Sequence, residues 1–130
     1  MIKGNTGRTI AISACIILGV TVAWLACQFG KATMQAAFAE EQVRIFYAMR
    51  DRARPLSPVQ AVESLEYAAG YYPSGTKQTA GSRLDRLVEA VRVDVCRQIM
   101  GELKTKTGEQ IETVDGWREW KSKAGKKEHN

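Results

Sequence analysis

Histidine is almost absent from this sequence: the 130 residues contain one, His129. A catalytic triad of the serine-hydrolase kind needs a histidine base, and histidine is a common ligand of zinc. The three cysteines stand 12 and 69 positions apart, a spacing that matches no metal-binding motif. We therefore predict that the protein is not an enzyme and that it holds no cofactor, no metal and no small-molecule substrate.

A disulfide framework is also excluded for the part of the chain outside the apolar run. Cys15 and Cys27 fall within that run, which leaves Cys96 as the one cysteine elsewhere. A lone cysteine has no intramolecular partner. We interpret all three as small apolar packing residues, with palmitoylation of Cys27 or an intermolecular disulfide as the alternatives.

Charge is missing from 22 consecutive residues, 9–30. Of the 20 residues from Ile10 to Phe29, four are not apolar: Ser13, Gly19, Thr21 and Gln28. A helix of about 20 residues crosses a hydrocarbon layer about 30 Å thick. The roughly 100 other residues are too few to enclose a helix that is apolar on every side. We predict a transmembrane helix over residues 10–30, preceded by an N-terminal flank, residues 1–9.

A cleaved signal peptide is the main alternative. Lys3 and Arg8 form a basic leading region, and residues 37–39 have the small-x-small pattern of a cleavage site. However, the apolar run is longer than the usual length of about 7–15 residues, and the site lies ten residues beyond its end. A lipoprotein signal fits less well, because Cys15 precedes most of the run. We favour a retained signal-anchor and keep release by cleavage after Ala39 as the alternative.

The distribution of charge gives an orientation. Lys3 and Arg8 precede the apolar run, whereas Lys31 and the more distant Arg44 follow it. This bias favours a cytoplasmic N-terminus, with the C-terminal domain on the far side of the membrane. The formal net charge of +5 divides into +3 at the flanks of the run, −1 over residues 40–116 and +3 over residues 117–130.

The apolar run also contains a periodic pattern of small residues. They recur at every fourth position: Ala11, Cys15, Gly19, Ala23 and Cys27. Small residues at this spacing form a transmembrane packing face, because they let two membrane helices approach closely. We predict self-association through this face. The alternative is a chance pattern in a segment rich in small residues.

The rest of the sequence is predicted to be helical. Residues 31–54 lack proline and form a juxtamembrane helix, with Phe38, Ile45 and Met49 on one side. A small helical domain follows over residues 55–123. Its core is a helical hairpin of residues 58–69 and 83–107. The fold class is therefore all-α: one transmembrane helix, then a hairpin and a short C-terminal helix.

Helix-ending residues support these boundaries. Ser57 and Gln60 form a capping box with Pro58 between them, and Gly70 is expected to end the first helix in a left-handed conformation. Ser82 caps the second helix and Gly108 ends it. The second helix has an apolar stripe and an opposite polar face. The stripe is Leu84, Val88, Val91, Val95, Ile99 and Leu103, with Leu87 and Cys96 beside it, and the polar face includes Arg86, Glu89 and Arg92. Asp85 lies in the first turn, where we expect its charge to complement the helix dipole.

The short last helix begins after Thr113 and carries Trp117 and Trp120 on one face, which we predict to be an aromatic contact. Residues 124–130 are predicted to be a basic disordered tail. Nucleic-acid binding is not expected, because about a dozen residues separate the two hairpin helices and a helix-turn-helix motif needs a turn of about three or four.

The loop between the hairpin helices is rich in hydroxyl groups and glycine, and it precedes a helix N-terminus, which attracts anions. The G-x-x-x-x-G-K-[ST] order of a nucleotide-binding loop is absent, and no strand precedes it. We therefore interpret the loop as a packed connection and a candidate contact surface. Its residues are Tyr71, Tyr72, Pro73, Ser74, Gly75, Thr76 and Lys77.

Two stretches carry a resemblance. The first is YYPSGTKQ followed by GSxLD, over residues 71–85, and the second is LxxKTG followed by WxxW, over residues 103–120. Together they resemble uncharacterised short single-pass membrane proteins of bacteria. The resemblance implies no known activity and no catalytic residue.

These observations lead to one functional expectation. We expect a membrane-anchored helical protein with a structural or protein-interaction role. Its partners would be the lipid bilayer and either another protein or a second copy of the chain. The alternative is a secreted or periplasmic helical binding module released by cleavage after Ala39. An enzyme using the loop of residues 74–82 is the third class.

Overall fold

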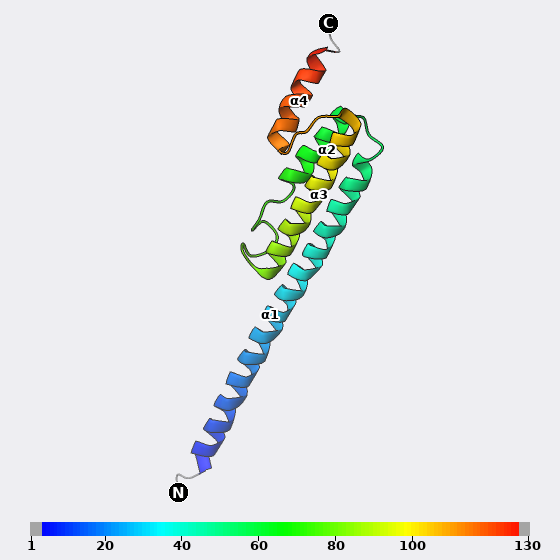
Figure 1. Cartoon of the computed structure of the whole chain (residues 1–130). Helices are drawn as coiled ribbons and strands as arrows, with labels where there is room; N and C mark the ends of the chain where they lie inside the picture. Colours follow the sequence, from blue (N-terminus) through cyan, green and yellow to red (C-terminus); the bar gives the residue numbers. More distant parts are fainter. Residues whose placement is uncertain (1–3, 128–130) are drawn as a thin grey trace. The chain divides into compact units, whose positions relative to one another are not determined.

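The computed structural model describes residues 4–127, and the side chains of residues 7–124. Four helices and no strands are found in this range, which confirms the all-α fold class. They are α1 (Gly4–Ala53), α2 (Pro58–Gly70), α3 (Arg83–Thr107) and α4 (Val114–Lys127) (Figure 1). The chain divides into two compact units, residues 1–36 and residues 37–130. We call the second unit the helical domain.

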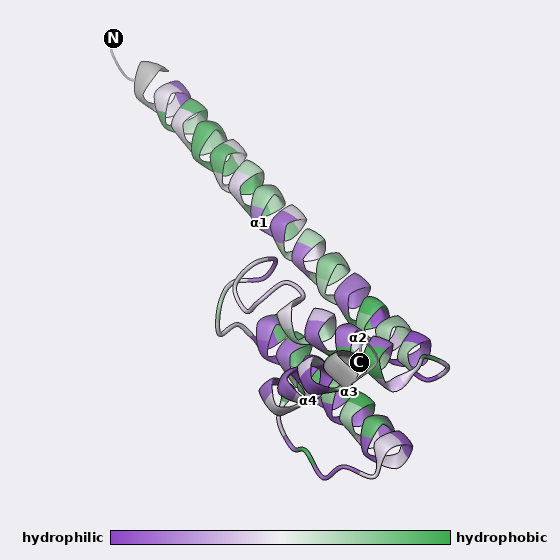
Figure 2. Cartoon of the chain, turned by 90° about the horizontal axis from the view of Figure 1, so that it is seen from above, coloured by the Kyte–Doolittle hydropathy of each residue, from purple (hydrophilic) through white to green (hydrophobic). Residues whose placement is uncertain are grey.

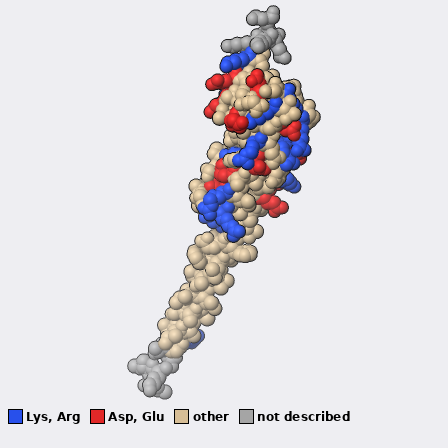
Figure 3. Space-filling view, in the orientation of Figure 1, with Lys and Arg blue, Asp and Glu red and all other residues tan. Residues whose placement is uncertain are grey.

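The first unit is the apolar part of α1. By length and composition this helix is able to cross a membrane, and none of its most apolar window is buried. Figure 2 shows that much of this segment is coloured as hydrophobic, and Figure 3 shows a long stretch of it without charged side chains on the face in view. The hydroxyl of Thr21 donates a hydrogen bond to the carbonyl of Ile17 at 2.8 Å, so this polar group is satisfied within the helix.

The helical domain begins at residue 37 and not at residue 55 as the sequence suggested, because the second part of α1 belongs to it. Phe46 is fully buried, and Met49 and Ala53 are buried in the same core as residues of α2 and α3. Residues 31–54 are therefore not a separate juxtamembrane element. The predicted hairpin of α2 and α3 is covered on one side by α1. Of the predicted contact side of α1, Ile45 is half-buried and Phe38 is exposed.

The sequence predicted the start of α2 correctly but not the conformation of its end. Ser57 and Gln60 form the expected capping box, in which the Ser57 hydroxyl accepts from the Gln60 amide at 3.4 Å. Gly70, however, is the last helical residue and is not left-handed. The chain turns at Tyr72 instead, with φ of 40°. The backbone N–H of Tyr71 bonds to the carbonyl of Ala68, and Arg92 of α3 bonds to the carbonyls of Tyr71 and Tyr72 just beyond the helix.

The caps of α3 are as predicted. The Ser82 hydroxyl accepts from the Asp85 amide at 3.2 Å, and Gly108 ends the helix in a left-handed conformation with φ of 77°. The predicted stripe is buried or half-buried, but Leu87 is exposed. Arg92 was assigned to the polar face and is buried. The reason is that α3 packs against both α1 and α2, so its buried arc is wider than one stripe.

The last helix packs on α2. The Thr113 hydroxyl caps it by accepting from the Gly116 amide at 3.1 Å. The helix continues through residues 124–127, so this part of the predicted disordered tail is helical. Residues 128–130 lie outside the described residues.

Replacing Phe46 with alanine tests whether α1 is part of the domain core. We expect the free energy of unfolding to fall by about 3–5 kcal/mol, because a fully buried aromatic side chain is lost and a cavity remains. The neighbouring Tyr47 is exposed, so Tyr47→Ala is the matched control and should change stability by less than about 1 kcal/mol. Near-ultraviolet circular dichroism of the full chain in detergent would follow the unfolding. Equal losses for the two variants would contradict the assignment.

Candidate functional site

The most distinctive surface of the domain is a cluster of three tyrosines where α2 passes into the loop. The ring of Tyr71 lies 5.5 Å from that of Tyr67 and 4.6 Å from that of Tyr72. On its inner side Tyr71 packs edge-on against Phe46 of α1, at 5.8 Å. Burial raises the pKa of the Tyr71 hydroxyl, so the group remains neutral. Tyr71 therefore joins the core to an exposed aromatic surface.

Tyr67 is the most exposed member, with 61% of its surface accessible. It lines three hollows of the domain surface. One is a groove of about 300 Å³ between α1 and α2. The groove is lined by Ile45, Ala48, Met49, Arg52, Ser64, Tyr67 and Tyr71. Sequence reasoning missed Tyr67, because an isolated aromatic residue beside an apolar stripe carries no signal of its own.

Asp85 holds the loop of residues 71–82 in place. Its carboxylate accepts hydrogen bonds from the Ser74 hydroxyl at 2.5 Å and from the amides of Gly75 and Gly81 at 3.0 and 2.8 Å. The side chain is buried, with 4% exposed. The bond from Ser74 is the largest cause that lowers the pKa of Asp85, followed by the two backbone amides. Asp85 was predicted to complement the helix dipole, and its main partners are instead in the loop.

The hydrogen bonds of Asp85 leave little room for a phosphate-binding site in this loop. A phosphate at such a loop would use free backbone amides near the start of α3. Two of those amides, of Gly75 and Gly81, already bond to the carboxylate of Asp85. Ser74 is likewise engaged with this carboxylate. The geometry therefore favours a packed connection over an anion site.

Arg92 of α3 holds the start of the same loop. Its guanidinium group donates to the carbonyls of Tyr71, at 2.8 Å, and Tyr72. It also lies 3.2 Å from the Glu89 carboxylate and 5.5 Å from the centre of the Phe46 ring. Its Nε atom is buried without a hydrogen-bond partner. A buried charge needs such partners, so Arg92 and the loop stabilise each other.

The far part of the loop is held against α1. The amide nitrogen of Gln78 donates to the side-chain oxygen of Gln42 at 2.7 Å, and both side chains are buried. The ammonium of the neighbouring Lys77 lies over two rings, 5.3 Å from the centre of Phe38 and 4.8 Å from that of Tyr72. The predicted contact loop is therefore anchored at several points, with Tyr72 and residues 73–76 exposed and Tyr71 and Lys77 half-buried.

The two tryptophans have different positions. Trp117 is fully buried, and its indole N–H donates to the Ile111 carbonyl at 3.1 Å. Trp120 is half-buried and packs edge-on against it, with centroids 5.6 Å apart. Trp117 therefore belongs to the core and is not available to a partner. Only Trp120 remains as a candidate aromatic contact.

The predicted packing face of the apolar run is entirely exposed within the chain. A side chain added at Gly19 would meet nothing within 4 Å. The face consists of Ala11, Cys15, Gly19, Ala23 and Cys27, and no described residue of the chain covers it.

The remaining reactive groups have structural partners. Burial raises the pKa of the Cys96 thiol, which disfavours the nucleophilic thiolate. Glu66 is bonded by Lys121 at 2.5 Å and Arg118 at 2.9 Å, and these bonds, Lys121 first, lower its pKa. Among the described residues, no three of His, Cys, Asp and Glu are grouped to hold a metal ion.

Replacing Asp85 with asparagine tests its hold on the loop. Because its pKa is lower in the folded state, the carboxylate contributes stability above its ordinary pKa of about 3.9. That contribution is lost as the pH falls through the lower folded-state value. We expect Asp85→Asn to speed hydrogen exchange at Gly75 and Gly81 at neutral pH and to flatten the acid limb of the thermal-stability profile.

Asp115 provides the control, because it also lies in the first turn of a helix but is exposed. Asp115→Asn should leave exchange in the loop unchanged. Unaltered exchange in the Asp85 variant would show that the loop does not depend on this carboxylate.

The comparisons with known proteins complete the description of the site. No family model, no curated protein and no solved structure matches the chain. The resemblance of the loop and the WxxW segment to short single-pass membrane proteins therefore stays a prediction. What is established is an all-α fold with one helix long and apolar enough to span a membrane.

Proposed function

We propose that this is a single-pass membrane protein with a structural or protein-binding role and without catalysis. The observation that carries the proposal is the complete exposure of the apolar segment. Large side chains such as Ile10, Leu18 and Phe29 are exposed over more than 60% of their surface within the described part of the chain. Exposing so many contiguous apolar side chains to water is unfavourable, whereas a bilayer accommodates them. The charge bias favours a cytoplasmic N-terminus, and we propose that the domain lies on the far side of the membrane.

Retention of the anchor is supported by the position of the alternative cleavage site. Ala39 lies within α1 and belongs to the domain core, with 3% of its surface exposed. Cleavage after this residue would cut a folded helix and remove a core residue. The alternative, a secreted or periplasmic binding module that starts at Glu40, would have to form its core without Ala39.

Membrane extraction combined with intact mass measurement tests the anchor. We expect the full-length chain to stay in the membrane pellet at alkaline pH. The double variant Leu18→Arg, Val22→Arg should move to the soluble fraction, because each arginine near the centre of a span costs about 2.5–3.5 kcal/mol. Leu87→Arg, Val93→Arg is the matched control, since both residues are exposed in the domain. A soluble product starting at Glu40 would establish the alternative.

The domain offers surfaces for a protein partner, and the apolar segment offers one for a second copy. In the domain, the tyrosine cluster and its groove supply exposed aromatic area, which is enriched at protein interfaces. In the membrane, the exposed face of small residues suits close helix packing. We propose self-association through that face as one part of the function.

Replacing Gly19 with isoleucine tests self-association. The branched side chain would hold two helices apart at the face of small residues, so we expect the dimer signal in a membrane two-hybrid assay to be lost. Leu18→Ile alters the neighbouring position outside the face and should leave the signal unchanged. An undiminished signal from Gly19→Ile would exclude this face as the interface.

A further inference from the structure

The order of the helices fixes which end of the domain carries the loop of residues 71–82. The chain enters the domain at residue 37 of α1, turns back through α2, and reaches the loop before α3. Two contacts confirm that the loop lies beside the entry point: Lys77 over the Phe38 ring, and Gln78 bonded to Gln42. In Figure 1, α4 lies at the opposite end of the domain.

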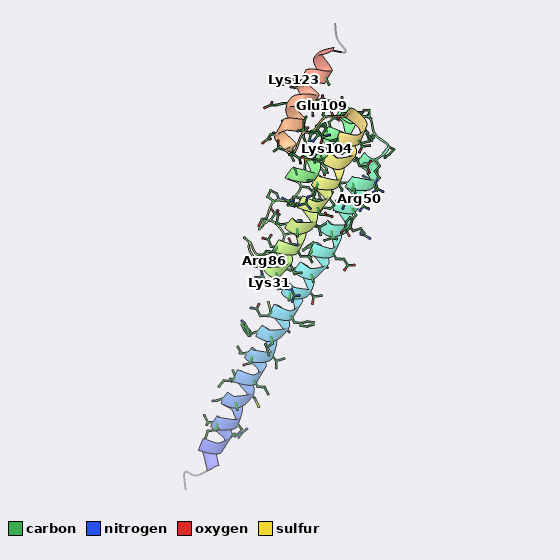
Figure 4. The ribbon with its side chains drawn as sticks, viewed as in Figure 1. Lys31, Arg50, Arg86, Lys104, Glu109 and Lys123 are labelled. Carbon is green, nitrogen blue, oxygen red and sulfur yellow. The ribbon has the colours of Figure 1, made fainter. Side chains whose placement is uncertain are left out.

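Positive charge gathers at this end, with Arg83 and Arg86 exposed and Lys77 half-buried. Residues 71–86 contain Lys77, Arg83 and Arg86 and one acid, Asp85, which is turned inward and bonded to the loop. Arg83 and Arg86 are exposed in the first turns of α3, and Figure 4 shows Arg86 at the loop end of this helix. The three basic residues together with Tyr72 form what we call the loop-end surface.

The acids on the neighbouring part of α1 do not cancel this charge. Glu40 and Glu41 are both exposed, and Glu41 forms an ion pair with Arg44. One acid therefore stands against three basic side chains. The exposed Phe38 and Tyr72 rings hold the Lys77 ammonium between them. Aromatic rings beside basic side chains are the composition of surfaces that lie at the membrane–water interface.

The chain length keeps this end of the domain close to the bilayer. Seven residues, 30–36, connect Phe29 at the end of the apolar segment to the domain. Even fully extended they reach about 25 Å at most. Because the loop-end surface lies beside the entry point, it belongs to the part of the domain that is tethered most closely to the apolar segment.

We propose that the loop-end surface docks on anionic phospholipid headgroups of the membrane in which the chain is anchored. The basic side chains contact lipid phosphates, and Tyr72 lies at headgroup level. Docking would hold the tyrosine cluster and the groove of the domain at a defined distance from the bilayer. The inference rests on the proposed function, because it requires the anchor, and it names the lipid class that the domain recognises.

Hydrogen exchange of the full chain in nanodiscs tests this docking. We expect exchange in residues 71–86 to be slower in nanodiscs with phosphatidylglycerol than in pure phosphatidylcholine, and the difference to shrink in high salt. The variant Lys77→Gln, Arg83→Gln, Arg86→Gln should lose the difference. Each basic residue near an anionic surface changes the binding constant roughly fivefold. Removing three of them is therefore expected to lower the equilibrium constant between docked and undocked domains about a hundredfold.

The matched control removes three exposed positive charges elsewhere, by Arg52→Gln, Arg97→Gln and Lys123→Gln, and should keep the difference. Inorganic phosphate added to phosphatidylcholine nanodiscs should not reproduce it. Equal exchange in both lipids, an equal loss in the control variant, or protection by free phosphate would each overturn the docking proposal. Failure of the chain to enter nanodiscs at all would instead reject the anchor.

Discussion

Burial of one face of α1 against α2 and α3 is the interaction on which the helical domain depends. The face is formed by Ala39, Phe46, Met49 and Ala53, and all four are buried. Phe46 lies at its centre, in contact with the Tyr71 ring from α2's end and with the Arg92 guanidinium from α3. Without this face the hairpin of α2 and α3 would leave part of its apolar surface uncovered.

The first part of α1 has a different distribution of apolar side chains. There the apolar side chains are exposed all along the helix, and no residue in the described part of the chain covers them. From residue 37 onward the buried apolar residues Ala39, Phe46, Met49 and Ala53 lie on one side, and most of the charged residues are exposed. A change from an all-round apolar surface to a one-sided one is what a helix needs when its two parts lie in different solvents. This contrast is the physical basis of the proposal that the chain is anchored in a membrane.

In the loop, buried polar groups hold the backbone in place. Asp85 and Arg92 are buried and form hydrogen bonds with backbone groups of the loop. Gln78 of the loop is buried and bonds to the buried side chain of Gln42 in α1. Buried polar groups are costly when unpaired, so a loop that satisfies them is held in one conformation. The ordered loop then presents Tyr72 and the basic side chains of the start of α3 at a fixed position relative to residue 37. This is a rigid surface suited to contact.

Local rules predicted much of the secondary structure. The capping box at Ser57, the cap at Ser82 and the left-handed Gly108 involve residues within four positions of each other, so their chemistry is readable from the sequence. Gly70 was predicted wrongly by the same rule: it is the last residue of α2, and the left-handed residue is Tyr72, in a stretch whose carbonyls are bonded by the distant Arg92. The 124–127 segment was predicted to be disordered from its charge, and α4 continues through it.

The candidate site was predicted only in part. The loop was identified from its composition, but not the partners that order it, since Asp85 and Arg92 look like ordinary polar-face residues of one helix. Tyr67 and the burial of Trp117 depend on where α1 and α4 pack, which no short-range pattern records.

By itself, the sequence determined the apolar span, the helical class and most helix ends, because these follow from composition, period and local hydrogen bonding. Only the tertiary structure decided that residues 37–53 of α1 belong to the domain and that Arg92 is buried. It also placed the loop beside the entry of α1. The physical reason is that these features depend on which faces meet, and pairing between distant helices is chosen by the packing of the whole core.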